Sequence, residues 1–179
     1  MPELTMHILI DGYNLIRQSV KFRRFERHSL EAGRNALIAS LSDYKKRRGH
    51  KITVIFDGWE SGSAQEERDF QAGINIMYSS RGEKADEVIK RLTAESDEEI
   101  VVVSSDREIL SFAIRRGKTT ISSPEFETIM TKAISGPQTF EFEEAKDNED
   151  KYSRSIKKRG PAHRLPRAQR NAQTKIKKL

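Results

Sequence analysis

Short apolar runs that are closely followed by an aspartate recur along this chain, and they constrain its fold more than any other feature. The first run, residues 8–10, stops at Asp11, and the clearest later run, residues 100–103, is followed by Asp106. Such continuous apolar runs are typical of strands that are buried on both faces of a parallel sheet. Because the carboxyl ends of parallel strands meet at one edge of the sheet, the aspartates are expected to converge there.

Helical patterns separate these runs. The expected strands include residues 8–10, 52–56, 74–78, 100–103 and 119–121, and the expected helices include residues 29–48, 85–94, 109–114 and 124–134. Residues 59–72 are polar and are expected to form a loop with a short helix. The alternation predicts an α/β fold, with helices on both faces of a central, mostly parallel sheet of about five strands.

Charge is divided unevenly along the chain. Residues 1–150 contain 22 Lys or Arg and all 27 Asp or Glu, a net −5, whereas residues 151–179 contain 11 Lys or Arg and no acid, a net +11. We therefore expect a domain at residues 1–144 and a basic, disordered or weakly helical tail at residues 145–179. Such a tail is expected to bind a polyanion, and nucleic acid is the commonest polyanion of the cytosol.

The composition also excludes several classes of protein. The chain contains no cysteine, which excludes disulfides, cysteine nucleophiles and cysteine-ligated zinc. No apolar run approaches the roughly 20 residues that a membrane-spanning helix needs. The first residues lack the basic flank and apolar core of a signal peptide. We expect a cytoplasmic protein with no membrane partner.

Four aspartates at strand ends or helix starts form the candidate site: Asp11, Asp57, Asp86 and Asp106. Carboxylates that gather at one place repel one another unless a cation offsets the repulsion. Mg²⁺ or Mn²⁺ suits such a site, because hard divalent cations prefer oxygen ligands and can activate water for attack on a phosphodiester. Any single aspartate is equally well explained as a cap or turn residue, so the prediction depends on their joint placement.

Polar side chains beside these aspartates are the candidate substrate contacts: Asn14, Arg81, Lys84 and Ser105. The amide of Asn14 is expected to bind a water of the metal ion or a phosphate oxygen. The two cations precede Asp86 in a loop, where they are expected to hold the substrate backbone through charge-assisted contacts. A solvated loop explains these cations equally well.

Four segments resemble the successive motifs of the YacP-like NYN domain family, which are PIN-like ribonucleases of bacteria: residues 8–14 (ILIDGYN), 54–58 (VIFDG), 81–89 (RGEKADEVI) and 102–109 (VVSSDREI). The resemblance covers about residues 6–135. It implies a PIN-like three-layer α/β/α sandwich, a divalent metal site and RNA cleavage. It matches Asp11, Asp86 and Asp106 to the core acids of the family and Asn14 to its asparagine, with Asp57 as an additional acid. One member is a ribosome-associated mRNA endonuclease, so the resemblance implies RNA, including mRNA at the ribosome, as the partner.

The residues and the resemblance together predict an endoribonuclease that depends on Mg²⁺ or Mn²⁺. The alternative is a non-catalytic RNA- or ribosome-binding module with the same fold. An aspartyl phosphatase is disfavoured, because Asp11 lacks the second aspartate two residues further on that such enzymes use. Dinucleotide binding is disfavoured because no G-x-G-x-x-G follows the first strand. A DNA flap nuclease would share the metal chemistry, and only the resemblance favours RNA.

Overall fold

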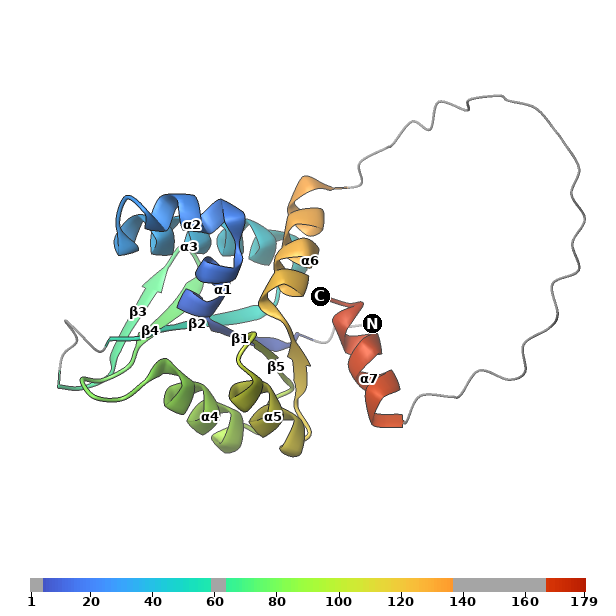
Figure 1. The fold of residues 1–179 in the computed structure, drawn as a ribbon. Helices are drawn as coiled ribbons and strands as arrows, with labels where there is room; N and C mark the ends of the chain where they lie inside the picture. The colour runs from blue at the N-terminus through green and yellow to red at the C-terminus, as the bar shows by residue number, and fades with distance from the viewer. Residues whose placement is uncertain (1–4, 59–63, 137–166) are drawn as a thin grey trace, which may run out of the picture.

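The computed structural model describes residues 5–58, 64–136 and 167–179. Its strands are β1 (His7–Asp11), β2 (Lys51–Phe56), β3 (Glu67–Gln71), β4 (Ile74–Tyr78), β5 (Ile100–Val103) and β6 (Thr119–Ile121). They form one sheet in the order β3-β4-β2-β1-β5-β6 (Figure 1). Every neighbouring pair is parallel except β3 and β4, which are antiparallel. The mostly parallel sheet predicted from the sequence is confirmed, with six strands instead of five.

The helices lie on both faces of this sheet. They are α1 (Gly12–Gln18), α2 (Val20–Glu26), α3 (Leu30–Arg48), α4 (Ala85–Glu95), α5 (Arg107–Arg115), α6 (Ser123–Ser135) and α7 (Arg167–Ile176). Helices α1, α2, α3 and α6 cover one face, and α4 and α5 cover the other (Figure 1). None of the helices in the described ranges is both long enough and apolar enough to cross a bilayer.

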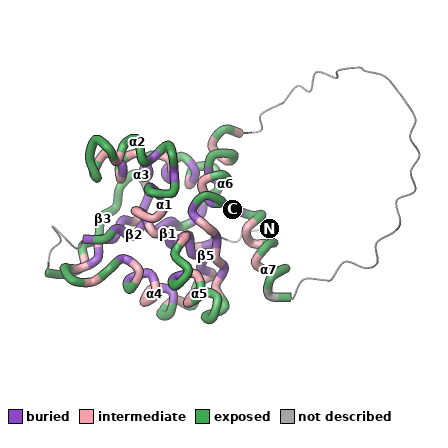
Figure 2. The backbone as a smooth tube through the Cα atoms, viewed as in Figure 1, coloured by how far each residue is buried: buried purple, intermediate pink, exposed green. Residues whose placement is uncertain are grey.

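Two apolar clusters hold the three layers together, one on each face of the sheet. Successive side chains of a strand point to opposite faces. Ile8 and Ile10 of β1 therefore lie in the cluster beneath α1, α2, α3 and α6, whereas Leu9 lies in the cluster beneath α4 and α5. Figure 2 shows the result, with buried strands between helices whose outer faces are exposed. Burial on both faces explains why these strands read as continuous apolar runs.

Helix α3 begins and ends where the sequence indicates. The hydroxyl of Ser29 accepts a hydrogen bond from the backbone N–H of Ala32 at 2.9 Å, which caps the first turn. Gly49 ends the helix with a φ of 72°, a left-handed conformation that favours glycine. The predicted helix at residues 29–48 is confirmed.

Strand β3 differs from the prediction of a loop with a short helix at residues 59–72. All five residues of β3 are exposed. An edge strand that buries no side chain shows no apolar alternation, because only its backbone hydrogen bonds to β4 hold it. Residues 59–63 lie outside the described part of the chain.

The last part of the predicted basic tail is helical and packs on the sheet. Residues 145–166 lie outside the described residues, so the boundary at residue 144 stays a prediction. Residues 167–176 form α7, which packs against β6, and Leu179 is 1% exposed within the core beside Tyr44. The backbone oxygen of Leu179 accepts a hydrogen bond from the Tyr44 hydroxyl. Only one or two apolar side chains of this segment, such as Leu179, contact the core, so its sequence shows no apolar periodicity. Tertiary packing, which the sequence pattern does not predict, holds the segment in place.

Candidate active site

A cleft of about 800 Å³ lies at the carboxyl end of the sheet. Six of the predicted site residues line it: Asp11, Asn14, Asp57, Lys84, Asp86 and Asp106. Strand β1 is central, with β2 and β4 on one side and β5 and β6 on the other. The strand order therefore reverses between β1 and β5, and open α/β sheets bind their ligands at such a point.

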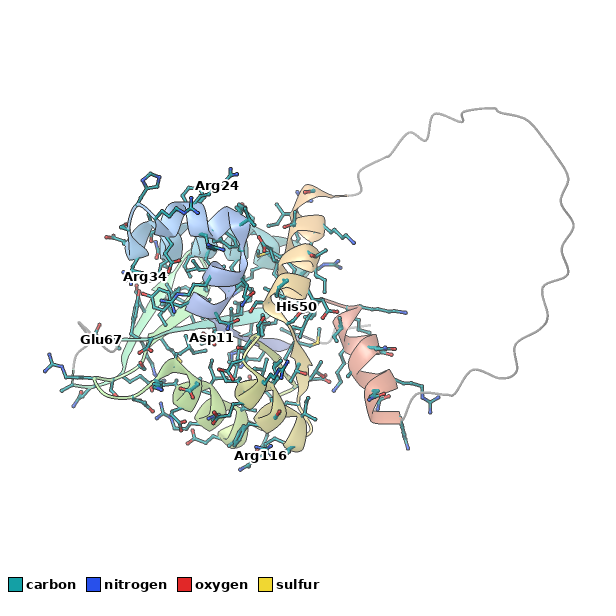
Figure 3. The ribbon with its side chains drawn as sticks, viewed as in Figure 1. Asp11, Arg24, Arg34, His50, Glu67 and Arg116 are labelled. Atoms are coloured by element: carbon teal, nitrogen blue, oxygen red, sulfur yellow. The ribbon has the colours of Figure 1, made fainter. Side chains whose placement is uncertain are left out.

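Asp11 lies at the carboxyl end of the central strand β1, where the strand order reverses (Figure 3). It is the last residue of β1 and the N-cap of α1, and its Oδ1 lies 3.4 Å from the backbone N–H of Asn14. Its Oδ2 accepts a hydrogen bond from the Ser104 hydroxyl at 3.1 Å. Ser104 is fully buried at the end of β5, and its oxygen also accepts from the backbone N–H of Asp106 at 3.1 Å. One serine thus ties two of the predicted catalytic residues together.

The carboxyl group of Asp11 is the most perturbed acid of the site. Burial raises its pKa from the ordinary value of 3.8 to about 6. Hydrogen bonds from Ser104 and Asn14 lower the pKa, while the negative charges of Asp106 and Asp86 raise it. Asp106 and Asp86 therefore lie close enough to Asp11 for their charges to act on it.

Asp86 and Asp106 already have partners. Asp106 caps α5 by accepting a hydrogen bond from the backbone N–H of Glu108 at 2.7 Å. Asp86 lies 3.5 Å from Nζ of Lys90, which also donates to Glu87 at 3.2 Å and to Glu108 at 2.5 Å. The hydrogen bond to Glu108 is the main cause that raises the pKa of Lys90, so the ammonium stays charged. The sequence analysis missed Lys90, although its position four residues after Asp86 is a recognisable ion-pair spacing.

Asp57 lies at the end of β2, directly before Gly58. The Ser79 hydroxyl contacts Asp57 Oδ1 at 3.4 Å and accepts a hydrogen bond from the backbone N–H of Gly58 at 3.0 Å. This serine fixes the turn that presents Asp57 to the cleft. Asp57 is exposed, in contrast to the part-buried Asp11.

The ligand atoms that this site offers are of the chemical type that hard divalent cations prefer. All are carboxylate oxygens, and the pKa of Asp11 is raised mainly by burial and in smaller part by the negative charges of Asp106 and Asp86, which a cation would offset. No group of three or more His, Cys, Asp or Glu in the described ranges is already arranged to hold a metal ion. Lys90 approaches only one carboxylate oxygen of Asp86, Oδ2, at 3.5 Å. The residues thus fit the cation by charge and by ligand type.

Asn14 has a structural role that the sequence analysis did not predict. Its Oδ1 accepts hydrogen bonds from the backbone N–H of Ser105 at 2.8 Å and from the Ser123 hydroxyl at 2.7 Å. The side chain therefore links α1 to the loop after β5 and to the start of α6. The proposed contact with a ligand stays a prediction for the amide nitrogen of Asn14.

Two of the predicted substrate contacts, Ser105 and Arg81, are not among the described residues that line the cleft. The Ser105 hydroxyl accepts a hydrogen bond from the backbone N–H of Ser123 at 3.3 Å, so it serves the connection between β5 and α6. Arg81 is exposed in the loop before α4. Both residues were predicted as substrate contacts because they lie near an aspartate in the sequence. The loop conformation decides where each side chain points, and the sequence does not predict it.

Replacing Asn14 by alanine is expected to lower the free energy of unfolding by about 1–3 kcal/mol, because a part-buried backbone N–H and a hydroxyl lose their shared acceptor. Denaturant unfolding of the metal-free protein measures this loss. The control is Ser123→Ala, which removes one of the two donors and should cost less. An unfolding midpoint of Asn14→Ala that equals that of the wild type would contradict the structural role.

Known proteins that resemble this chain agree with the fold described above. The sequence model of the YacP-like NYN domain matches residues 8–177. The chain belongs to the YacP-like NYN domain family. The family match extends through α7, beyond the segment of residues 6–135 in which the motifs are visible. The protein YacP of Bacillus subtilis (strain 168) is 27% identical over 85 residues, 48% of this chain and 49% of YacP. The matched stretch thus spans about half the length of that relative.

Solved structures confirm the fold of this NYN domain. The crystal structure of Rae1 (YacP) from Bacillus subtilis superposes with a TM-score of 0.59 at 22% identity, covering 70% of this chain and 74% of the other. A mutant of the same protein gives a TM-score of 0.60 at 23% identity, covering 72% and 77%. The PIN-like α/β/α sandwich that the resemblance implies is therefore the fold of this chain.

Proposed function

We propose that this NYN-domain protein is an endoribonuclease that hydrolyses RNA phosphodiester bonds in the presence of Mg²⁺ or Mn²⁺. Asp11, Asp86 and Asp106 are the proposed catalytic and metal-binding residues, and Asp57 is a further ligand. The observation that supports this proposal most strongly is that all four carboxylates line one cleft where the strand order reverses. Membership of a nuclease-like family favours RNA, and the resemblance extends the proposal to cytoplasmic mRNA at the ribosome.

The residues of the chain divide the work of such a site. Ser104 holds Asp11 at the end of β1, so that its carboxylate stays fixed while substrate enters. Lys90 offsets the charge of Asp86 when the site is empty of cations. Lys84, at the start of α4, supplies a positive charge at the lining of the cleft for a phosphate oxygen. A divalent cation held by the aspartates would polarise the phosphodiester and activate water for attack on phosphorus.

The test is cleavage of RNA by the full chain with Mn²⁺, with Mg²⁺ and with EDTA. We expect cleavage only with a divalent cation, and a loss of at least about 100-fold in the Asp106→Asn variant, since metal-assisted charge stabilisation contributes several kcal/mol. Asparagine preserves the cap of α5. The matched control is Asp43→Asn, an exposed acid of α3 that pairs with Lys46, and its activity should equal that of the wild type.

A non-catalytic RNA-binding module remains the second candidate, and one observation favours it. The aspartates of the described chain are not preassembled into a three-ligand group. Salt-sensitive RNA binding without product in Mn²⁺ would establish this alternative. Undiminished cleavage in Asp106→Asn would contradict the assigned carboxylates, and equal cleavage in EDTA would contradict the metal dependence.

A further inference from the structure

The cleft has a second wall that the proposed catalytic residues do not use. Four side chains form this wall, which we call the Arg–Tyr wall: Tyr13, Arg17, Arg34 and Tyr78. Helices α1 and α3 supply the first three, whereas Asp86 and Asp106 belong to the start of α4 and α5 on the opposite face of the sheet (Figure 1). The cleft therefore receives Tyr13 and two arginines from the side of α1 and α3, and it receives Asp86, Asp106 and Lys84 from the side of α4 and α5.

An aromatic cluster supports the Arg–Tyr wall. The ring of Tyr13 contacts that of Phe56 edge-on, with centroids 5.1 Å apart, and the ring of Tyr78 stacks on Phe56 at 5.8 Å. Phe56 is fully buried at the end of β2. Because the rings fix one another, the wall offers a preformed surface and not a set of independent side chains.

Arg34 of α3 is a cation at the lining of the cleft whose side chain is held by two tyrosines (Figure 3). Its Nη1 donates a hydrogen bond to the Tyr13 hydroxyl at 2.8 Å, and its Cζ lies 5.7 Å from the centroid of the Tyr78 ring. A guanidinium carries five N–H donors, and the one hydrogen bond that the Arg34 side chain makes within the described residues goes to the Tyr13 hydroxyl. Its remaining donors are available to a ligand that enters the cleft.

Arg34 forms no salt bridge within the described residues, although the acids Asp57 and Glu67 line the same cleft. In contrast, Lys90 of α4 contacts three carboxylates. Burial raises the pKa of the Tyr78 hydroxyl above its ordinary value of 10, so this phenol is neutral at pH 7. A part-buried guanidinium beside two tyrosines, with no salt-bridge partner in the described part of the chain, is therefore suited to bind an anion.

Arg17 extends the wall towards solvent. Its Cζ lies 5.4 Å from the centroid of the Tyr13 ring, and its side chain is 65% exposed. Its contact with Glu26 is 3.6 Å long, which is a weak surface pair. Arg17 thus adds positive charge at the rim, while Arg34 provides the fixed geometry.

We propose that Arg34, oriented by Tyr13 and Tyr78, binds a phosphodiester of single-stranded RNA that neighbours the one at the carboxylates. This inference rests on the proposed function. A fixed guanidinium matches two phosphate oxygens at once, which a lysine does not. The guanidinium planes of the wall lie on aromatic rings, and unpaired bases stack on such planes. Contact with a neighbouring phosphate sets the position of the strand relative to Asp11, so the wall determines which bond faces the carboxylates.

The test measures RNA binding separately from cleavage. The Asp11→Asn variant in EDTA provides a full chain whose binding of a short unstructured RNA is measured without turnover. Adding Arg34→Gln is expected to weaken binding by about 10-fold or more, because a charge-assisted contact is lost. Arg34→Lys should recover only part of the affinity, and the same sequence presented as a duplex should bind more weakly than the single strand.

Arg116 provides the matched control. It is an exposed arginine at the end of α5, its Cζ lies 5.3 Å from the centroid of the Phe112 ring, and it is not among the residues that line the cleft. Arg116→Gln removes the same charge and should change the affinity by less than about 2-fold, since only a phosphate contact carries a large share of binding. Equal RNA affinity of the Arg34→Gln and Arg116→Gln variants would overturn the role of Arg34. Equal binding of duplex and single strand would overturn the assignment of single-stranded RNA.

Kinetics distinguish this inference from the proposed function. In the otherwise wild-type chain, Arg34→Gln should raise KM for RNA and shift the cleavage positions, because the strand loses its register. An unchanged KM and an unchanged cleavage pattern would overturn the inference and leave the nuclease assignment intact. Binding that depends on Arg34 without cleavage by the wild type would overturn the nuclease assignment and support the RNA contact.

Discussion

An Asp11→Asn variant is expected to lose RNA cleavage by about 10²–10³-fold or more and, without metal, to be more stable than the wild type at neutral pH. The loss of activity follows from removal of a proposed ligand whose cation contributes several kcal/mol to the transition state. The gain in stability follows from the partial burial of Asp11 among like charges. Asparagine keeps one oxygen for the N-cap, and its NH2 group takes the place of the second oxygen, where the Ser104 hydroxyl can accept instead of donating, so the fold loses little.

The gain in stability depends on pH in a defined direction. Because the folded protein raises the pKa of Asp11 from 3.8 to about 6, the folded state binds this proton more tightly than the unfolded state. Between these two values stability falls as pH rises, and well above pH 6 the full cost of about 3 kcal/mol is present. The melting temperature of Asp11→Asn in EDTA should therefore exceed that of the wild type by about 6–12 °C at pH 7.5 and by little near pH 4.

Two comparisons make this result specific. Asp43→Asn removes an exposed acid and should change the melting temperature little at either pH. Added Mg²⁺ or Mn²⁺ should raise the melting temperature of the wild type and leave that of Asp11→Asn unchanged, because a ligand stabilises only the state that binds it. A variant that is less stable than the wild type at pH 7.5 would contradict the electrostatic cost assigned to Asp11.

The second large effect is expected from Gly12→Ala, which should lower the free energy of unfolding by about 2–3 kcal/mol. Gly12 has no positive φ, so its backbone conformation does not require glycine. A Cβ at this position would overlap the Phe56 ring and lie 2.9 Å from Cγ1 of Val54. Both neighbours are fully buried in β2, and Phe56 carries the aromatic cluster, so neither moves at low cost. Denaturant unfolding measures the effect.

A double mutant tests the cause. Phe56→Leu creates space beside residue 12 and should itself be destabilising, because it leaves a cavity. If the clash explains the cost of Gly12→Ala, the two substitutions together should cost less than the sum of their separate effects. Strictly additive effects would show that the close packing of α1 on β2 is not the reason for glycine.

The parallel sheet made part of this site predictable from the sequence. Asp11, Asp57 and Asp106 each follow a strand whose apolar run is unmistakable, and parallel strands bring such positions to one edge. Asp86 reaches the same cleft from the first turn of α4. The topology of the sheet therefore brings these aspartates to one cleft, and the apolar runs of the sequence predict that topology well.

Residues on helix surfaces and edge strands were not predictable in this way. Arg34 reads as one of several cations on α3, and only the packing of α3 on the sheet turns it towards Tyr78. A glycine directly after a strand is typical of a turn, whereas the structure requires Gly12 for space. Strand β3 and Leu179 depend on partners far away in the chain, and no local pattern reports those partners.

The hydrogen bond between Ser104 and Asp11 joins residues 93 positions apart. Pairing of β1 with β5 closes this long loop. Contacts of such high sequence separation slow folding, because the chain loses the entropy of loop closure before the contact contributes favourable free energy. A nascent or partly folded chain in which β5 has not docked carries Asp11 and Asp57 without Asp106. In the proposed nuclease, formation of the central strand pair would therefore act as the step that switches the enzyme on, and incomplete chains would leave RNA intact.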